Sequence, residues 1–132
     1  MKMIKKYVLF FAVGGVGYGL LELLWRGYTH PTMILAGGIC FIIFSLIAER
    51  LCPLPLLIKA ALAAVAVTAV ELVFGLIFNL GLGLGVWDYA DRPLNLLGQI
   101  CVPFTLLWLA LGIIFVPIAD VLNKCLEPHT HP

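Results

Sequence analysis

The chain has 132 residues, of which 63% are hydrophobic and only 11% are charged, and its formal net charge is +1. A soluble domain carries about 25% charged residues, so this composition cannot cover a water-exposed surface and excludes a soluble globular protein. The small net charge, with basic residues close together only at Lys2, Lys5 and Lys6, predicts no nucleic-acid partner, and the lipid bilayer is the expected surrounding.

Four apolar segments are long enough to cross a bilayer as helices, which takes about 20 residues each. The first covers about residues 6–25 and exceeds the about 7–15 apolar residues of a signal peptide. Because no A-x-A cleavage site follows it, we expect a retained membrane helix. The other segments cover about residues 31–48, 55–80 and 98–119. The sequence therefore predicts an all-α polytopic membrane protein whose residues 1–132 form a single four-helix transmembrane domain.

The basic residues of the short loops predict the orientation of these spans, because such residues favour the cytoplasmic side. If both termini are cytoplasmic, the residues between the third and fourth spans lie outside. Two basic residues, Arg26 and Arg92, then lie outside as well. Six lie inside: Lys2, Lys5, Lys6, Arg50, Lys59 and Lys124.

Two pairs of short strings suggest an internal repeat. "LAGGIC" (35–40) resembles "LLGQIC" (96–101), and "ELLW" (22–25) resembles "ELVF" (71–74). In each copy a span with a glutamate leads through an outer loop to an uncharged span. The pattern predicts two tandem helical hairpins, although chance similarity of such apolar strings stays open. Sites in transporters built from parallel repeats lie near the repeat interface.

Two glutamates lie within the predicted spans. A carboxylate at the depth of Glu71 costs about 2.5–3.5 kcal/mol on insertion scales. Glu71 is therefore either a proton, cation or substrate site, or one end of a hydrogen bond between helices. Glu22 precedes Arg26 by one helical turn, so it either forms an ion pair with Arg26 or joins Glu71 around one cavity.

The most polar stretch of the chain separates the third and fourth spans. Alternating glycines at Gly81, Gly83 and Gly85 make a poor helix, so we expect the third span to unwind there. The aromatic and charged residues that follow form either an interfacial loop or a lid or re-entrant segment over an outward-facing polar pocket. Our candidate ligand-binding residues are Glu22, Glu71, Asn79, Trp87, Asp88, Tyr89, Asn95 and Gln99.

The sequence gives no sign of a catalytic residue, a metal site or a cofactor. The four cysteines form no C-x-x-C motif and have no histidine at a metal-ligand spacing. No serine–histidine or cysteine–histidine arrangement is visible either. A membrane enzyme with Glu71 and Asp88 as acid and base stays as a third hypothesis, behind a transporter component and a binding module.

"VWDYADRPLNLLGQICVPFTLLW" (86–108) resembles a signature of small bacterial membrane proteins, W-D-Y-S-x-x-P-x-N-x-x-G-x-I-C followed after six residues by W. That family is labelled ABC-transporter type IV, or CmpB-like permease, and is similar to the vertebrate TMEM229 proteins. Ala90 stands where the family usually has serine. The matching residues are Trp87, Asp88, Tyr89, Pro93, Asn95, Gly98, Gln99, Cys101 and Trp108.

The resemblance implies a multi-pass protein of the bacterial inner membrane with a role in transport. Four helices rarely enclose a translocation path alone, so we expect a homo-oligomer or a partner membrane subunit. No ATPase motif occurs in the chain, so any use of ATP belongs to another protein. The expected ligand is an unknown small molecule or ion. The alternative is a lipid- or metabolite-binding regulatory module that transports nothing.

Overall fold

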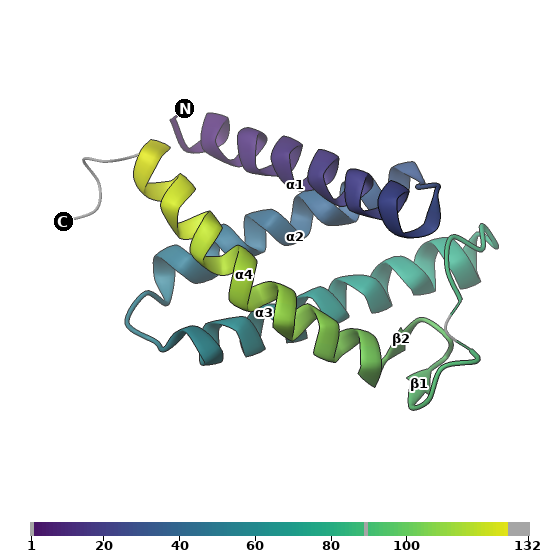
Figure 1. Cartoon of the computed structure of the whole chain (residues 1–132). Coiled ribbons are helices and arrows are strands. Elements are labelled where there is room, and N and C mark those ends of the chain that lie inside the picture. The colour runs from purple at the N-terminus through teal and green to yellow at the C-terminus, as the bar shows by residue number, and fades with distance from the viewer. Residues whose placement is uncertain (1, 89, 127–132) are drawn as a thin grey trace.

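The structure is a computed structural model that describes residues 2–88 and 90–126 (Figure 1). Four long helices form a bundle, and each is long and apolar enough to cross a membrane. This arrangement confirms the predicted all-α polytopic fold. The elements are α1 (Lys2–Arg26), α2 (Pro31–Arg50), α3 (Leu56–Phe74), its π-helical continuation η1 (Gly75–Gly81), β1 (Asn95–Leu96), β2 (Ile100–Cys101) and α4 (Val102–Leu126).

The fourth helix departs most from its predicted span, because it covers Val102–Leu126 instead of residues 98–119. Residues Leu97 (φ 57°) and Gly98 (φ 71°) are left-handed, and such residues do not continue a right-handed helix. They form the turn between β1 and β2, in which the Gln99 N–H donates to the Leu96 carbonyl at 3.0 Å. Asn95 and Gln99 therefore lie on a short antiparallel hairpin and share no helical face.

The helices associate mainly as two pairs, α1 with α2 and α3 with α4, while α2 also contacts α3 and α4 (Figure 1). Glycines permit the close approach of α1 and α2. A Cβ atom on Gly14 would lie 2.7 Å from the Gly37 carbonyl oxygen, and one on Gly37 would lie 2.5 Å from the Tyr18 Cβ. Close glycine contacts are typical of packed membrane helices. The pairing agrees with two tandem hairpins, and the internal repeat stays a prediction.

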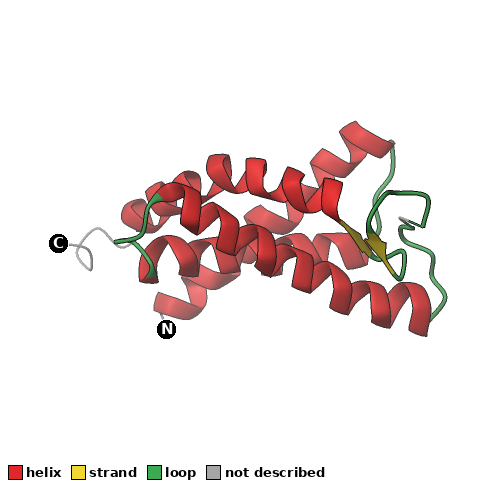
Figure 2. Cartoon of the chain, turned by 90° about the horizontal axis from the view of Figure 1, so that it is seen from below, coloured by secondary structure: helices red, strands yellow, loops and turns green. Residues whose placement is uncertain are grey.

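The two ends of the bundle differ. At the terminal end, α1 begins and α4 ends; at the loop end, residues 82–101 form a loop that carries the β1–β2 hairpin (Figure 2). Two polar contacts that the sequence did not predict lie at the terminal end. Lys6 Nζ lies 2.6 Å from Glu49 Oε2. The fully buried Ser45 hydroxyl donates to Asn123 Oδ1 at 2.8 Å, which ties α2 to α4.

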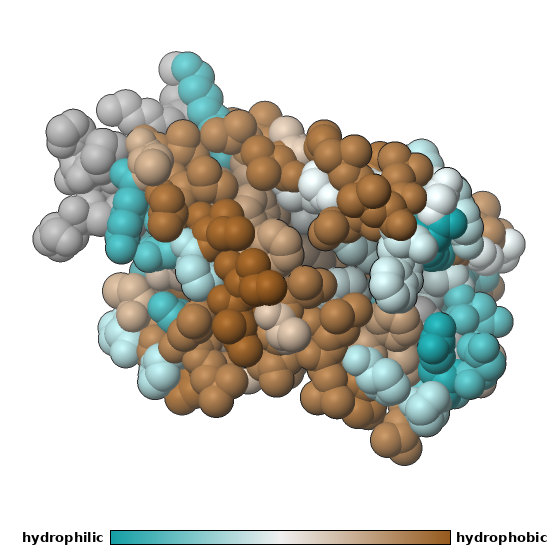
Figure 3. Space-filling model, in the orientation of Figure 1, coloured by the Kyte–Doolittle hydropathy of each residue, from teal (hydrophilic) through white to brown (hydrophobic). Residues whose placement is uncertain are grey.

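Apolar side chains occupy both the interior and the outer surface. One core cluster, around Phe10 and Val116, lies toward the terminal end, and a second, around Phe74 and Trp87, lies toward the loop end. Many others face outward, as the hydrophobic face in Figure 3 shows; Leu24 is 85% exposed. Exposed apolar surface of this extent is typical of a surface that contacts lipid or protein.

Candidate functional site

A groove of about 450 Å³ lies between α1 and α4, and α2 and α3 form its floor. The face in Figure 3 is hollowed between these two helices, and hydrophobic side chains border the hollow. The groove is almost entirely apolar. This differs from the polar pocket that the sequence suggested. Its walls include Gly17, Tyr18, Leu21 and Leu24 of α1, and Trp108, Leu111, Phe115, Ile118 and Leu122 of α4; Cys40, Phe41 and Phe44 of α2 and Val67, Val70 and Glu71 of α3 lie below them.

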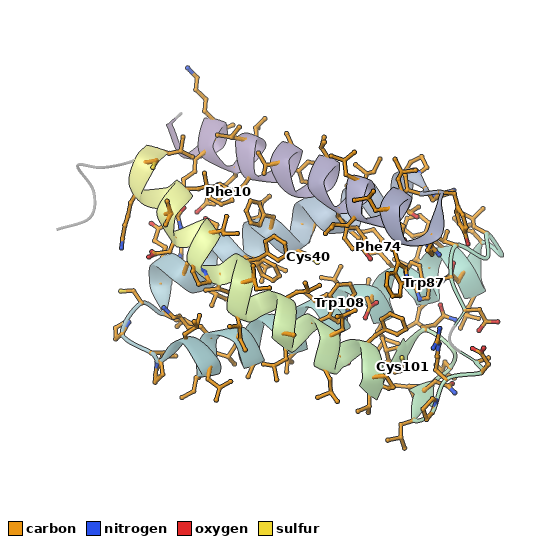
Figure 4. The ribbon with its side chains drawn as sticks, viewed as in Figure 1. Phe10, Cys40, Phe74, Trp87, Cys101 and Trp108 are labelled. Carbon is orange, nitrogen blue, oxygen red and sulfur yellow. The ribbon has the colours of Figure 1, made fainter. Side chains whose placement is uncertain are left out.

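Glu71 is the one charged residue among the described residues that line the groove. It is 8% exposed, and Trp108 Nε1 on α4 donates a hydrogen bond to its Oε1 at 2.9 Å. The Tyr18 and Trp108 rings lie 6.1 Å apart between their centroids. Figure 4 shows Trp108 directed from α4 toward the middle of the bundle. We call Glu71, Trp108 and Tyr18 together the Glu71 site: one acid beside two aromatic rings in an apolar groove.

Trp108 and Tyr18 were not among the predicted site residues. Trp108 closes the sequence signature from 86 to 108, and Tyr18 precedes Glu22 by one helical turn, so both had a sequence signal. Neither sequence pattern indicates a contact with Glu71. Trp108, for example, is 37 residues away from Glu71 and lies on another helix. Only the packing of α3 against α4 brings the indole to the carboxyl group.

Glu22 lies outside the groove and forms the local ion pair that was one of its two interpretations. Arg26 Nε lies 2.6 Å from Glu22 Oε2, and Arg26 Nη2 donates to Glu22 Oε1 at 3.2 Å. The same guanidinium donates through Nη1 to the Val86 carbonyl at 3.1 Å. Arg26 therefore connects the last turn of α1 to the loop after η1, and Glu22 orients it.

Three predicted residues meet at the loop end, where they bind one another and the loop backbone. Asn79 Nδ2 donates to Gln99 Oε1 at 2.8 Å, and Asn79 Oδ1 accepts from the Val86 N–H at 2.7 Å. Trp87 Nε1 donates to the Gln99 carbonyl at 2.9 Å. All three side chains are buried. Of the three, only Trp87 also lines the groove, so this network fixes the loop beside the groove at Trp87.

The π-helix η1 positions this network. A Cβ atom on Gly75 would lie 2.5 Å from Gln99 Oε1, so only a glycine lets the Gln99 side chain lie against the helix. A π-helix adds a residue to the turn and is frequent at functional sites. The glycines were expected to unwind the third span. The helix ends at Gly81, as expected, and the positive φ values of Gly83 and Gly85 follow it; the widening into a π-helix from Gly75 was not predicted.

Asp88 and Asn95 are exposed and organise the turns of the loop. Asp88 Oδ1 accepts from the Ala90 N–H at 2.9 Å. Asn95 Nδ2 donates to the Arg92 carbonyl at 2.9 Å, and Asn95 Oδ1 accepts from the Gly98 N–H at 3.1 Å. Neither residue lines the groove. Tyr89, the remaining predicted residue, lies outside the described residues. Within residues 2–88 and 90–126, no cluster of three or more His, Cys, Asp or Glu could hold a metal ion.

Fold and site together define a multi-pass membrane protein with a buried acid in an apolar groove between its helices. The family described as "Putative ABC-transporter type IV" matches residues 8–129, and the chain belongs to this family. The match includes α2, α3, α4 and α1 from residue 8 onward, and it confirms the resemblance of the segment from 86 to 108. No curated protein and no solved structure matches the chain. The similarity to TMEM229 proteins stays a prediction.

Proposed function

We propose that this chain is a membrane-spanning subunit of a transporter and that the groove between α1 and α4 holds the transported small molecule. The placement of Glu71 in the groove carries this proposal. An acid at this depth costs about 2.5–3.5 kcal/mol, and ionisable residues within membrane spans typically mark substrate or ion paths. Glu71 is the one acid among the described residues that line this almost entirely apolar groove, so a small molecule held in the groove meets its carboxyl group.

The ligand site that we propose differs in part from the set expected from sequence. Glu71 and Trp87 stay in it, because both line the groove, and Trp108 and Tyr18 join them. The other described candidates act through the loop: Arg26, oriented by Glu22, binds it from α1, and Asp88 and Asn95 order its turns. Asn79 and Gln99 hold it on η1.

We propose further that the transporter is an assembly. The groove opens along the side of a single four-helix chain, and such a groove does not surround a translocation path. A second copy or a partner membrane subunit completes it, and any ATP hydrolysis belongs to a partner. The distribution of basic residues supports cytoplasmic termini in the bacterial inner membrane.

A binding module without transport is the second candidate, and the loop that is fixed at one end of the groove favours it. Trp87 of this loop lines the groove and is 7% exposed, as is Val86 before it. Arg26 binds the loop at the same place. In this alternative the groove holds its ligand, and nothing passes to the other side of the membrane.

Native mass spectrometry of the protein, extracted gently into lipid nanodiscs, tests the proposal. The expected result is an assembly larger than one chain with a reproducible bound molecule. Gly17→Leu fills the groove, because nothing lies within 4 Å of a Cβ atom at Gly17, and should release that molecule. Asp120→Asn removes an acid outside the groove and should retain it. A single chain with nothing bound would refute the proposal, and flux of the identified molecule into liposomes separates a transporter from a binding module.

A further inference from the structure

We propose that the groove binds a lipid-soluble amine, a molecule with one apolar chain and one amino group, and that the amine enters from the hydrocarbon of the bilayer. This inference rests on the ligand site proposed above and names its ligand class and its route of entry. Three features of the described residues carry it: the length of the groove, its open side, and the chemistry of the Glu71 site.

The groove has the length of an extended apolar chain. Its wall on α4 extends from Trp108 to Leu122, which is about 21 Å of helix at 1.5 Å per residue. The hydrocarbon core of a bilayer is about 30 Å thick, so the groove is longer than one leaflet of that core is deep. Between the ends of this wall, the α4 residues that face the groove are Leu111, Phe115 and Ile118. A single aliphatic chain fits such a surface.

The open side of the groove faces lipid. Leu20 and Leu24 on α1 are 57% and 85% exposed, and Ile118 on α4 is 43% exposed. These apolar side chains form the edges of the opening. At the loop end, the buried Trp87 side chain lines the groove. At the terminal end, the wall ends at Leu122, beside the buried Asn123 that is hydrogen-bonded to α2. A molecule dissolved in the bilayer therefore reaches the groove from the side.

The Glu71 site supplies the features that recognise an amine. A cation buried in an apolar site needs an anion beside it, and Glu71 is the one charged residue among the described lining residues. Aromatic faces attract an ammonium group within about 6 Å of the ring centre. The Tyr18 and Trp108 rings line the groove together with Glu71 and lie 6.1 Å apart, and Trp108 meets the carboxyl group through its N–H. A lipid with a carboxylate or phosphate at this position would meet a like charge when Glu71 is ionised and would have no proton to give when it is not, and a neutral alcohol would gain only a hydrogen bond.

The amine can reach the Glu71 carboxyl group from lipid in either of its protonation states. An amine that crosses the hydrocarbon in its neutral form takes the proton of the Glu71 carboxyl group. An amine that arrives as an ammonium ion meets the Glu71 carboxylate. Both routes end in the same pair, in which one N–H···O contact joins ammonium and carboxylate with no net charge. Binding in this form places no uncompensated charge in the groove.

Three probes with the same chain and different polar groups test the inference: dodecylamine, dodecanol and dodecanoate. Each is titrated into the protein in phosphatidylcholine nanodiscs, with empty nanodiscs subtracted, and the bound molecules are counted by native mass spectrometry. Removing one partner of a buried charge pair lowers affinity by about thirtyfold or more. We therefore expect the wild-type protein to prefer dodecylamine over both other probes by about that factor. Glu71→Gln, whose amide oxygen still accepts from Trp108, should lose the preference, and Asp120→Asn should keep it.

The outcomes distinguish this inference from the proposed function. Equal binding of all three probes by the wild-type protein, with loss of binding in Gly17→Leu, would overturn the amine and leave the groove as a site for apolar chains. Unchanged binding of dodecylamine by Gly17→Leu would overturn the groove as the binding site, and the proposed function with it. The comparison of probes on the wild-type protein decides the ligand class even if Glu71→Gln does not fold.

Discussion

The crossing of α1 over α2 should tolerate no side chain at Gly14, whereas Gly17 on the same helix should accept one. A Cβ atom at Gly14 would meet the Phe41 Cβ and would lie 2.7 Å from the Gly37 carbonyl oxygen. The Gly37 oxygen is a backbone atom of α2, and the Phe41 Cβ is the first carbon of its side chain. A change of rotamer moves neither atom away. The whole of α2 must move until the Gly37 oxygen reaches ordinary contact, at 3.4 Å or more.

The expected magnitude follows from two opposed terms. Overpacking a close contact costs about 1–3 kcal/mol, and replacing a helical glycine by alanine contributes about 1 kcal/mol in the favourable direction. Gly17→Ala keeps only the favourable term, because nothing lies within 4 Å of its new methyl group. Since both sites lie within α1, the helix term cancels between the variants. Gly14→Ala should therefore be less stable than Gly17→Ala by about 1–3 kcal/mol.

The assay is reversible unfolding of both variants in mixed micelles of a mild detergent and dodecyl sulfate, followed by helical circular dichroism. Gly37→Ala serves as a second test of the same crossing, because its Cβ atom would meet the Tyr18 side chain at 2.5 Å. We expect it to be destabilised in the same direction as Gly14→Ala. If Gly14→Ala and Gly17→Ala unfold at the same dodecyl sulfate fraction, the close crossing of α1 and α2 is wrong.

Three further predictions concern the contacts that hold the two ends of the bundle. Gly75→Ala should displace Gln99 from η1 and raise hydrogen exchange over residues 82–101 by tenfold or more, about the effect of losing 1.4 kcal/mol; unchanged exchange would show that the loop does not depend on this contact. Arg26→Gln should speed exchange near Val86, whose carbonyl loses its donor, and leave the helical content unchanged; the idea fails if α1 itself unfolds. Asn123→Ala should cost about 1–3 kcal/mol in the same dodecyl sulfate assay, because its buried serine partner on α2 loses a hydrogen bond, and a neutral result would mean that water replaces the amide.

Several features could be predicted from the sequence because they depend on one segment at a time. A helix crosses a bilayer when its own residues are apolar over about 20 positions, and each of the four predicted spans corresponds to one long apolar helix of the structure. The ion pair of Glu22 with Arg26 joins residues one turn apart, so it was already one of the two interpretations of Glu22. The end of the third helix near Gly81 follows from the conformational freedom of its glycines.

Only the tertiary structure determined which polar groups meet. The hydrogen bond from Trp108 to Glu71 and that from Asn79 to Gln99 join different segments, and the start of α4 depends on the hairpin that carries Gln99. The physical reason is that lipid is an apolar solvent. In a soluble helix the apolar stripe marks the buried face, but a membrane helix is apolar on its lipid face and on its packed face alike. The sequence could therefore determine how many helices span the bilayer, whereas the groove, its open side and the neighbours of Glu71 were decided by how those helices pack.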